Sequence, residues 1–148
     1  TYTDQGNFYE AEKLIIRIIN FQKKQFGSQH PNYAGALMNL SVLYSNMLLH
    51  ESAEPIYNEV KEIYFKVFGA MSSKYADCLN NLGILYLKTN RLKQSKLFLE
   101  KSINIRAKIF GKLSLEYAES LKTLANTFLE LKDYRLSLIH ISEPTRPY

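Results

Sequence analysis

The chain has 148 residues, of which 46% are hydrophobic and 22% are charged, and its formal net charge is +5. This composition is typical of a globular domain with a core, and it excludes a disordered or collagen-like chain. The single cysteine, Cys78, excludes an internal disulfide framework and a cysteine-based zinc module. No apolar run reaches the roughly 18 residues that a membrane span needs, and the N-terminus lacks a signal-peptide pattern, so we expect a cytoplasmic protein.

The first element expected in chain order is a helix from about Asn7 to Phe26. Its apolar side chains recur at steps of three and four residues, the spacing of one face of an amphipathic helix. Tyr2 fits the last turn of a preceding helix, so the chain is expected to begin there. The helix from Asn7 would then lack a packing partner on one side, where its apolar residues are Leu14, Ile15, Ile18 and Phe21.

The next two elements are helices joined by the short polar link NMLLHE, which makes them antiparallel neighbours. The first helix is expected to begin at Pro31. Proline has no backbone N–H, and in the first turn this donor would have no partner within the helix anyway. The second helix contains Pro55, which is tolerated if it lies in the first turn. The apolar stripes are Tyr33, Leu37, Leu40 and Tyr44 in the first helix, and Ala53, Ile56, Tyr57, Val60, Ile63, Tyr64 and Val67 in the second.

This pair of helices recurs along the chain with a period of 42, and the links KTNRLK and ELKDYR stand in place of NMLLHE. A period of this length is typical of stacked supersecondary units, so the sequence predicts an all-α solenoid of antiparallel helix pairs. Identical residues stand in all three copies at Phe26, Phe68 and Phe110; Gly27, Gly69 and Gly111; Tyr33, Tyr75 and Tyr117; Ala34, Ala76 and Ala118; Leu37, Leu79 and Leu121; and Leu40, Leu82 and Leu124.

Several repeated residues are predicted to have structural roles. The three repeated glycines are expected to end helices in the left-handed conformation, and the phenylalanine before each is expected to anchor the core. Ser41, Gly83 and Ala125 are small where the two helices of a unit face each other. The tyrosines fall mostly on the core stripes, which favours packing in the core over stacking on RNA bases.

The repeat boundaries divide the chain into an array and a tail. The array is predicted over residues 1–137, as a partial unit 1–27, units at about 31–69 and 73–111, and a truncated unit 115–137. Residues 138–148 lose the helical stripe and contain Pro144 and Pro147. We expect this tail to be translated read-through or an artificial addition rather than part of the native repeat.

The run LGILY from Leu82 to Tyr86, followed by Leu92 and Ser95, resembles the tetratricopeptide repeat signature. The period of 42 exceeds the roughly 34 residues usual in that family, and the segment FGSQHPNYAGALMNLSVLY resembles the repeats of kinesin light chains. The resemblance implies a right-handed superhelix. Its inner face, lined by the first helix of each unit, holds an extended peptide of a partner protein.

On this resemblance, the candidate peptide-binding residues are first-helix positions that point away from the core stripe. They are Met38, Asn39, Val42 and Asn46 in the first complete unit, Asp77, Asn80, Asn81, Ile84 and Lys88 in the second, and Glu119, Lys122, Thr123 and Asn126 in the third. An asparagine amide can donate to a peptide carbonyl and accept from a peptide N–H at once. Asn80 and Asn81 could equally be solvated polar residues without a ligand, and this alternative stays open.

Another use of the family is a clamp on the C-terminal carboxylate of a partner, which needs Lys, Asn and Arg at set inner-face positions. Only Asn81 fits that set, because the neighbouring units carry Met38, Val42, Glu119 and Thr123. The resemblance therefore disfavours a clamp on chaperone tails.

Residues that carry chemistry in other proteins have structural interpretations here. The repeat register places no histidine beside Cys78, so we expect a buried thiol rather than a nucleophile. His30 stands at a helix start, where capping is expected rather than metal binding. The sequence has no metal-ligand spacing, paired catalytic carboxylates or phosphate loop. We therefore expect no enzyme activity, no cofactor and no small-molecule substrate.

Three functions stay open. The first is a non-enzymatic scaffold or adaptor, similar to kinesin light chains, that binds peptide segments of partner proteins and is associated with the cytoskeleton or a cilium. The second is the regulatory or targeting part of a larger enzyme or signalling protein. The least favoured is nucleic-acid binding, because the basic residues are spread along the chain. It would use second-helix residues, namely Lys23, Lys24, Lys61, Lys66, Arg106 and Lys108.

Overall fold

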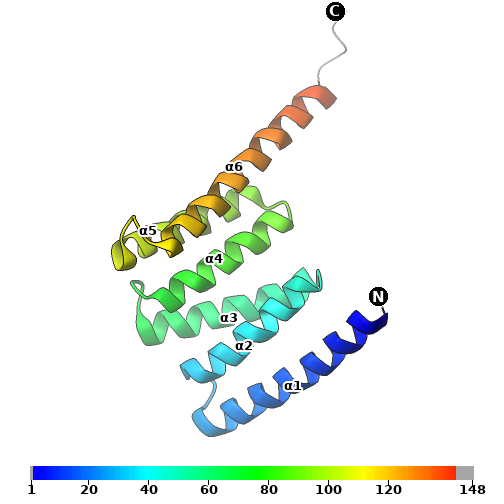
Figure 1. Ribbon diagram of the computed structural model, residues 1–148, viewed down its shortest axis with the longest axis vertical. Coiled ribbons are helices and arrows are strands. Elements are labelled where there is room, and N and C mark those ends of the chain that lie inside the picture. Colours follow the sequence, from blue (N-terminus) through cyan, green and yellow to red (C-terminus); the bar gives the residue numbers. More distant parts are fainter. Residues whose placement is uncertain (1, 143–148) are drawn as a thin grey trace, which may run out of the picture.

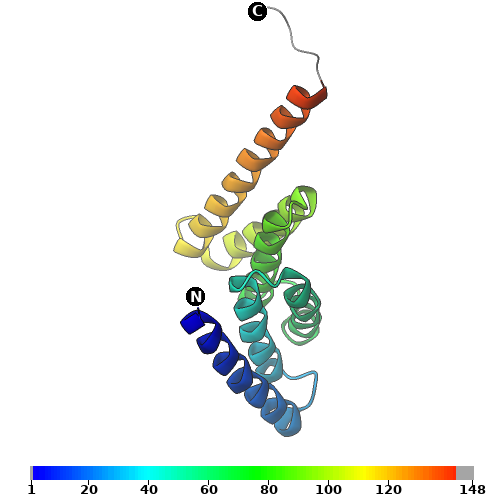
Figure 2. The ribbon, with the colours of Figure 1, turned by 90° about the vertical axis from the view of Figure 1, so that its right-hand side faces the viewer.

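The computed structural model describes the backbone of residues 2–142 and the side chains of residues 5–132. In that part of the chain there are six helices and no strand. They are α1 (Tyr2–Phe26), α2 (Pro31–Asn46), α3 (His50–Phe68), α4 (Ser73–Lys88), α5 (Leu92–Phe110) and α6 (Leu115–Ser142). Consecutive helices stack side by side, with α1 at one end of the array and α6 at the other (Figure 1 and Figure 2). The predicted all-α solenoid is confirmed.

The helix boundaries repeat at the interval found in the sequence. Both ends of α4 lie one full period after those of α2, and both ends of α5 lie one full period after those of α3. α6 begins at Leu115, again one period after the start of α4 at Ser73. α2, α4 and α6 are therefore equivalent first helices, and α3 and α5 are equivalent second helices. By the same register, α1 is a second helix.

The first helices begin at a repeated capping position. A side chain there accepts a hydrogen bond from a backbone N–H of the first turn, which has no partner within the helix. The three acceptors are His30 for Asn32 N (3.0 Å), Ser72 for Tyr75 N (3.0 Å) and Ser114 for Tyr117 N (3.2 Å). The predicted capping role of His30 is confirmed.

The second helices end at glycines with positive φ, at 87° for Gly27, 81° for Gly69 and 85° for Gly111. The predicted need for glycine is confirmed, but the conformation differs. Gly69 and Gly111 have ψ of −179° and 163°, an extended region that only glycine enters readily, in place of the left-handed helical one.

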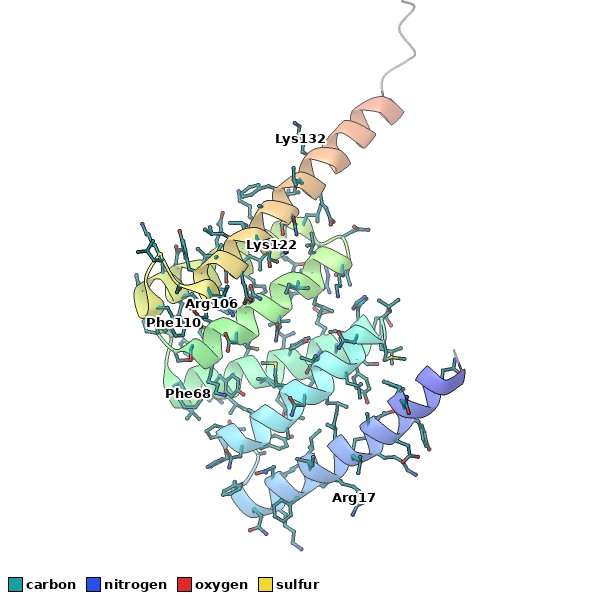
Figure 3. All side chains as sticks on the ribbon, viewed as in Figure 1. Arg17, Phe68, Arg106, Phe110, Lys122 and Lys132 are labelled. Atoms are coloured by element: carbon teal, nitrogen blue, oxygen red, sulfur yellow. The ribbon has the colours of Figure 1, made fainter. Side chains whose placement is uncertain are left out.

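The phenylalanine before each of these glycines is not the core anchor that the sequence predicts. Phe26, Phe68 and Phe110 are 49%, 42% and 43% exposed. Phe68 and Phe110 lie at the ends of α3 and α5, at one edge of the array (Figure 3). At a helix terminus these rings pack locally instead, as Phe26 does on His30 with ring centroids 4.5 Å apart.

The core lies between the helices of the two complete units. Val60, Leu82 and Leu99 are fully buried, and the tyrosines of the predicted stripes are buried or half-buried. Gly83 lies where α4 meets α5, and a Cβ at this position would stand 2.6 Å from the side chain of Leu99. Ser95 Oγ donates to the Gly83 carbonyl at 2.6 Å. The predicted close approach at this small residue is confirmed.

Both terminal helices differ from the sequence prediction, because neither contains the expected turn. α1 is one continuous helix from Tyr2, and α6 runs through the predicted link ELKDYR to Ser142. In the two complete units the turn uses positive φ at Leu48 (61°) and Asn90 (60°). The equivalent residue of α6, Lys132, is helical, so the chain continues straight. The predicted tail is thus helical as far as Ser142, and residues 143–148 lie outside the described part.

Pro55 lies deeper in its helix than the sequence predicts. α3 begins at His50, so Pro55 stands in the second turn rather than the first. Its ring cannot donate the hydrogen bond that the carbonyl of Glu51 would otherwise accept. Both residues are exposed, so water can satisfy this carbonyl and the helix tolerates the interruption.

Candidate functional site: the first-helix face

The thirteen candidate residues lie on α2, α4 and α6, and we call them the first-helix face. None of them is fully buried. The half-buried members are Met38, Asn80, Asn81, Ile84 and Thr123. The exposed members are Asn39, Val42, Asn46, Asp77, Lys88, Glu119, Lys122 and Asn126. The face is therefore accessible to a ligand, because its residues are not fully buried in the core.

One contact joins this face across two units. The amide Nδ2 of Asn81 on α4 lies 3.5 Å from Met38 Sδ on α2, to which it donates. A thioether is a weak acceptor. The amide of Asn81 is therefore held in place by a weak hydrogen bond and can exchange Met38 for a stronger acceptor.

The neighbouring asparagine is in a different environment. Asn80 Oδ1 is buried and accepts no hydrogen bond from the residues that the structure describes. Asn39, which is equivalent to Asn81 in the repeat, is exposed. The asparagines of the face thus differ in solvent access, although the sequence gives no reason to distinguish them.

Asp77 is already bound by another part of the chain. Its Oδ1 accepts from Arg106 Nη2 of α5 at 2.7 Å, and Arg106 Nη1 donates to Ser120 Oγ and to the Glu116 carbonyl of α6. Arg106 is only 6% exposed and lies where α4, α5 and α6 meet (Figure 3). Asp77 therefore belongs in the first instance to a junction between units.

Sequence reasoning considered Arg106 among the basic second-helix residues and did not find its partners. A signal was available, because three equivalent positions change together from one unit to the next. Tyr64, Gly35 and Cys78 of the first junction are replaced one period later by Arg106, Asp77 and Ser120.

Three of the four face residues on α6 are exposed, as are three of the four on α2. Lys122 and Asn126 are exposed, and Lys122 projects from α6 on the side of the array shown in Figure 3. Thr123 Oγ1 donates to the Glu119 carbonyl of its own helix at 3.1 Å. The face therefore presents cations at Lys88 and Lys122 and an acid at Glu119.

A second ion pair links consecutive units away from this face. Arg91, in the turn before α5, donates to both carboxylate oxygens of Glu54 on α3 at 2.8 and 2.7 Å. The guanidinium also lies 4.5 Å from the ring centroid of Tyr86. The hydrogen bonds from Arg91 lower the pKa of Glu54 below its ordinary value.

The cavities of the described part of the chain include four with volumes of about 250, 380, 400 and 610 Å³. The largest is lined by residues of α1 to α4, among them Gly35, Tyr64 and Phe68. None of these four cavities is lined by a residue of the first-helix face. These four cavities therefore lie outside that face.

The predicted structural role of Cys78 is confirmed. Its side chain is fully buried between α4 and α3, and its Sγ lies 3.4 Å from the Tyr57 carbonyl, to which it donates. Burial raises the pKa of the thiol to about 12. The thiolate is therefore scarce at neutral pH, and the thiol is a poor nucleophile.

One of the basic residues considered for nucleic-acid binding does not lie on the surface. Arg106 is buried and paired with Asp77, so it cannot contact a phosphate. Among the described residues, no group of three or more His, Cys, Asp or Glu side chains is arranged to hold a metal ion. None of the helices described here has the length and apolar character needed to cross a membrane.

Comparison with known proteins identifies the repeat. Two family models, both described as tetratricopeptide repeat, match residues 1–64 and 76–113. The chain belongs to the tetratricopeptide repeat family. A search of curated protein sequences found no match.

Solved structures with the same fold include BtubC (BKLC) and a putative kinesin light chain. BtubC (BKLC) from P. vanneervenii superposes with a TM-score of 0.78 at 18% sequence identity, over 99% of this chain and 63% of BtubC. A Podosopora anserina protein with nearly identical kinesin light chain TPR-like repeats has a TM-score of 0.76 and 18% identity, over 97% of this chain and 72% of that protein. The chain thus spans 63% of the length of BtubC. At this identity the likeness shows the fold alone.

Proposed function

We propose that this tetratricopeptide repeat array is a non-catalytic scaffold that binds extended peptide segments of partner proteins on the first-helix face. The contact between Asn81 and Met38 carries this proposal. The amide of Asn81 is positioned between two units but bonded only to a weak sulfur acceptor, at 3.5 Å. A peptide carbonyl is a better acceptor and would displace the sulfur. Met38 is flexible and would then pack against the side chain of the peptide.

The shape and charge of the face agree with a peptide ligand. The face is open, and it extends over three first helices. Exposed amides at Asn39 and Asn126 can hydrogen-bond to a peptide backbone, while Lys88 and Lys122 favour a segment that carries acidic side chains. We propose an adaptor role of the kinesin light chain type in the cytoplasm, with a protein rather than a nucleic acid as the partner.

A peptide-array screen followed by titration tests the proposal. We expect peptide hits to lose roughly fivefold in affinity on Asn81→Ala, since one hydrogen bond contributes about 1 kcal/mol. Losses of similar or smaller size are expected for Asn39→Ala and Lys122→Ala. Glu62→Ala, an exposed change on α3 outside the face, is the control and should leave affinity unchanged. Hits that are indifferent to all three face substitutions would contradict the proposal.

The same binding mode could serve a regulatory or targeting segment of a larger enzyme or signalling protein. In that case the bound segment would belong to the same polypeptide. A catalytic domain encoded in the same reading frame, together with a peptide hit from that domain, would favour this alternative over an adaptor.

A further inference from the structure

The two ends of the array expose apolar side chains that are covered elsewhere in the molecule. On α1, Leu14, Ile18 and Phe21 are 55%, 49% and 58% exposed. In α3 the residues equivalent to Ile18 and Phe21 are Val60 and Ile63. They are 0% and 2% exposed, because α2 packs on them. α1 thus exposes the surface that, in a complete unit, packs against the first helix of that unit.

α6 presents the opposite half of the same contact. Leu121 and Phe128 are 40% and 45% exposed. The equivalent residues of α4, Leu79 and Tyr86, are 1% and 5% exposed, because α5 covers them. Ala118 is also exposed, whereas its equivalents in α2 and α4 are fully buried.

The α4–α5 contact shows how two such surfaces fit together. Ser102 Oγ of α5 donates to the Ala76 carbonyl of α4 at 2.9 Å, so a small side chain on α4 faces this position of α5. The rings of Tyr86 and Phe98 stack with their centroids 5.2 Å apart. These contacts define the register of a first helix against its second helix.

From these observations we propose that the chain associates head to tail, with α1 of one copy packed on α6 of the next as α5 packs on α4. The register of the α4–α5 contact pairs Ile18 with Ala118 and Leu14 with Phe128. A large side chain meets a small one in the first pair, as at the equivalent positions Val60 and Ala34 of the core. The second pair buries two residues that are about half exposed.

The geometry of the array excludes closure within one molecule. α1 and α6 lie at opposite ends of the stack (Figure 2), so the two surfaces of a single chain cannot meet. The contact joins different surfaces of the two copies, and such a heterologous contact that does not close into a ring grows into an open assembly. The residues that carry the contact on α6, namely Ala118, Leu121 and Phe128, are not members of the first-helix face, so this inference does not depend on the proposed peptide binding.

Sedimentation velocity over a series of concentrations tests the inference. We expect the weight-average sedimentation coefficient of the native sequence to rise with concentration and to pass the value of a dimer. Ile18→Glu and Leu121→Glu should each be monomeric, since a carboxylate at either surface blocks the contact. Both side chains are solvent-exposed in the single chain, so circular dichroism should show unchanged helix content.

A mixture of the two variants provides the decisive result. The Ile18→Glu chain keeps its α6 surface and the Leu121→Glu chain keeps its α1 surface. An equimolar mixture should therefore form a dimer of one chain of each kind and nothing larger. Tyr9→Glu and Leu113→Glu are matched controls, because both residues are exposed and lie outside the two surfaces, and they should associate as the native sequence does.

Three outcomes would overturn the inference. The first is a native sequence that stays monomeric at every concentration, as expected if further helices of a longer chain are what covers these surfaces. The second is self-association of either variant alone, which indicates a symmetric contact between like ends. The third is a mixture that stays monomeric while the native sequence associates.

Discussion

The two junctions between consecutive units occupy equivalent places in the repeat but use different chemistry. At the first, Tyr64 of α3 is 3% exposed and lies beside Gly35 of α2, where a Cβ would stand 3.8 Å from the tyrosine Oη. Cys78 of α4 packs on the same helix, α3, and is fully buried. At the second junction, Arg106 of α5 takes the place of Tyr64. The same backbone geometry is thus built once from an apolar cluster and once from an ion pair.

The difference shows that the repeat constrains groups of residues rather than single positions. The guanidinium of Arg106 needs the carboxylate of Asp77, since a buried charge is tolerated only when it is paired. It also needs the hydroxyl of Ser120, where the first junction has a thiol. Arg106 Nε nevertheless remains buried without an acceptor among the described residues. The apolar junction has no such defect and should be the more stable of the two.

The largest effect is expected when the charge of the second junction is placed in the first. Tyr64→Arg buries a guanidinium beside Gly35, where the first junction has no carboxylate equivalent to Asp77, and should reduce the free energy of unfolding by about 4 kcal/mol. Urea denaturation followed by circular dichroism measures it. Adding Gly35→Asp should recover part of the loss. A loss in the free energy of unfolding no larger than that of Glu62→Arg, on the exposed side of α3, would contradict the expected difference between the two junctions.

The converse change in the second junction is expected to cost less. Asp77→Ala removes the carboxylate but leaves Arg106 bonded to Ser120 and to the Glu116 carbonyl, so the loss should be about 2 kcal/mol. Combining Asp77→Gly with Arg106→Tyr and Ser120→Cys rebuilds the first junction in the second. This triple variant should unfold at a urea concentration equal to or above that of the native sequence, and a value below that of Asp77→Ala would argue against the interpretation.

The turns within the two complete units give a smaller contrast. Leu48 and Asn90 are equivalent and both have φ near 60°, but only asparagine tolerates this conformation well. Leu48 is 72% exposed, so its side chain contributes little packing. Leu48→Asn should therefore stabilise the protein by about 1 kcal/mol. Thermal unfolding measures the gain, and Asn90→Leu should lower the midpoint by a similar amount.

The smallest effect concerns the ion pair between Arg91 and Glu54, because the first unit has Leu49 at the position of Arg91. Arg91→Leu should cost about 0.5 kcal/mol at neutral pH, as the pair is partly exposed. The folded protein lowers the pKa of Glu54 below 4.5, so the pair stabilises the fold above that pH and loses this contribution as the pH falls through the lowered pKa. Urea denaturation at a series of pH values should therefore show the difference between native and variant shrinking in acid.

The sequence predicted the parts of the fold that repeat. The period, the helix pairs and the close approach at Gly83 follow from equivalent positions that carry the same kind of residue, and the capping role of His30 follows from its place at a helix start. The turns expected in α1 and α6 were wrong, since a turn needs a helix to pack back upon as well as suitable residues. Phe68 was wrongly placed in the core for a related reason, because repetition shows that a residue is needed without showing what it contacts.

The candidate site was harder to predict than the fold. The residues of the first-helix face follow from the resemblance to tetratricopeptide repeats, applied to positions off the core stripe, and the structure leaves all of them outside the fully buried core. The contact of Asn81 with Met38 and that of Asp77 with Arg106 depend on side-chain rotamers across different helices, which spacing along one helix does not determine. The pairing of Asp77 with the buried Arg106 becomes visible in the sequence only when three sets of equivalent positions are compared together.

Cys78 also makes one of the two junctions directly observable. A thiol with a pKa of about 12 that is fully buried reacts with an alkylating reagent only when α4 separates from α3. The second junction has Ser120 at this place and is silent to the same reagent. The rate of alkylation under native conditions therefore reports the opening of a single contact within the array. It separates local fraying of the first junction from unfolding of the whole chain.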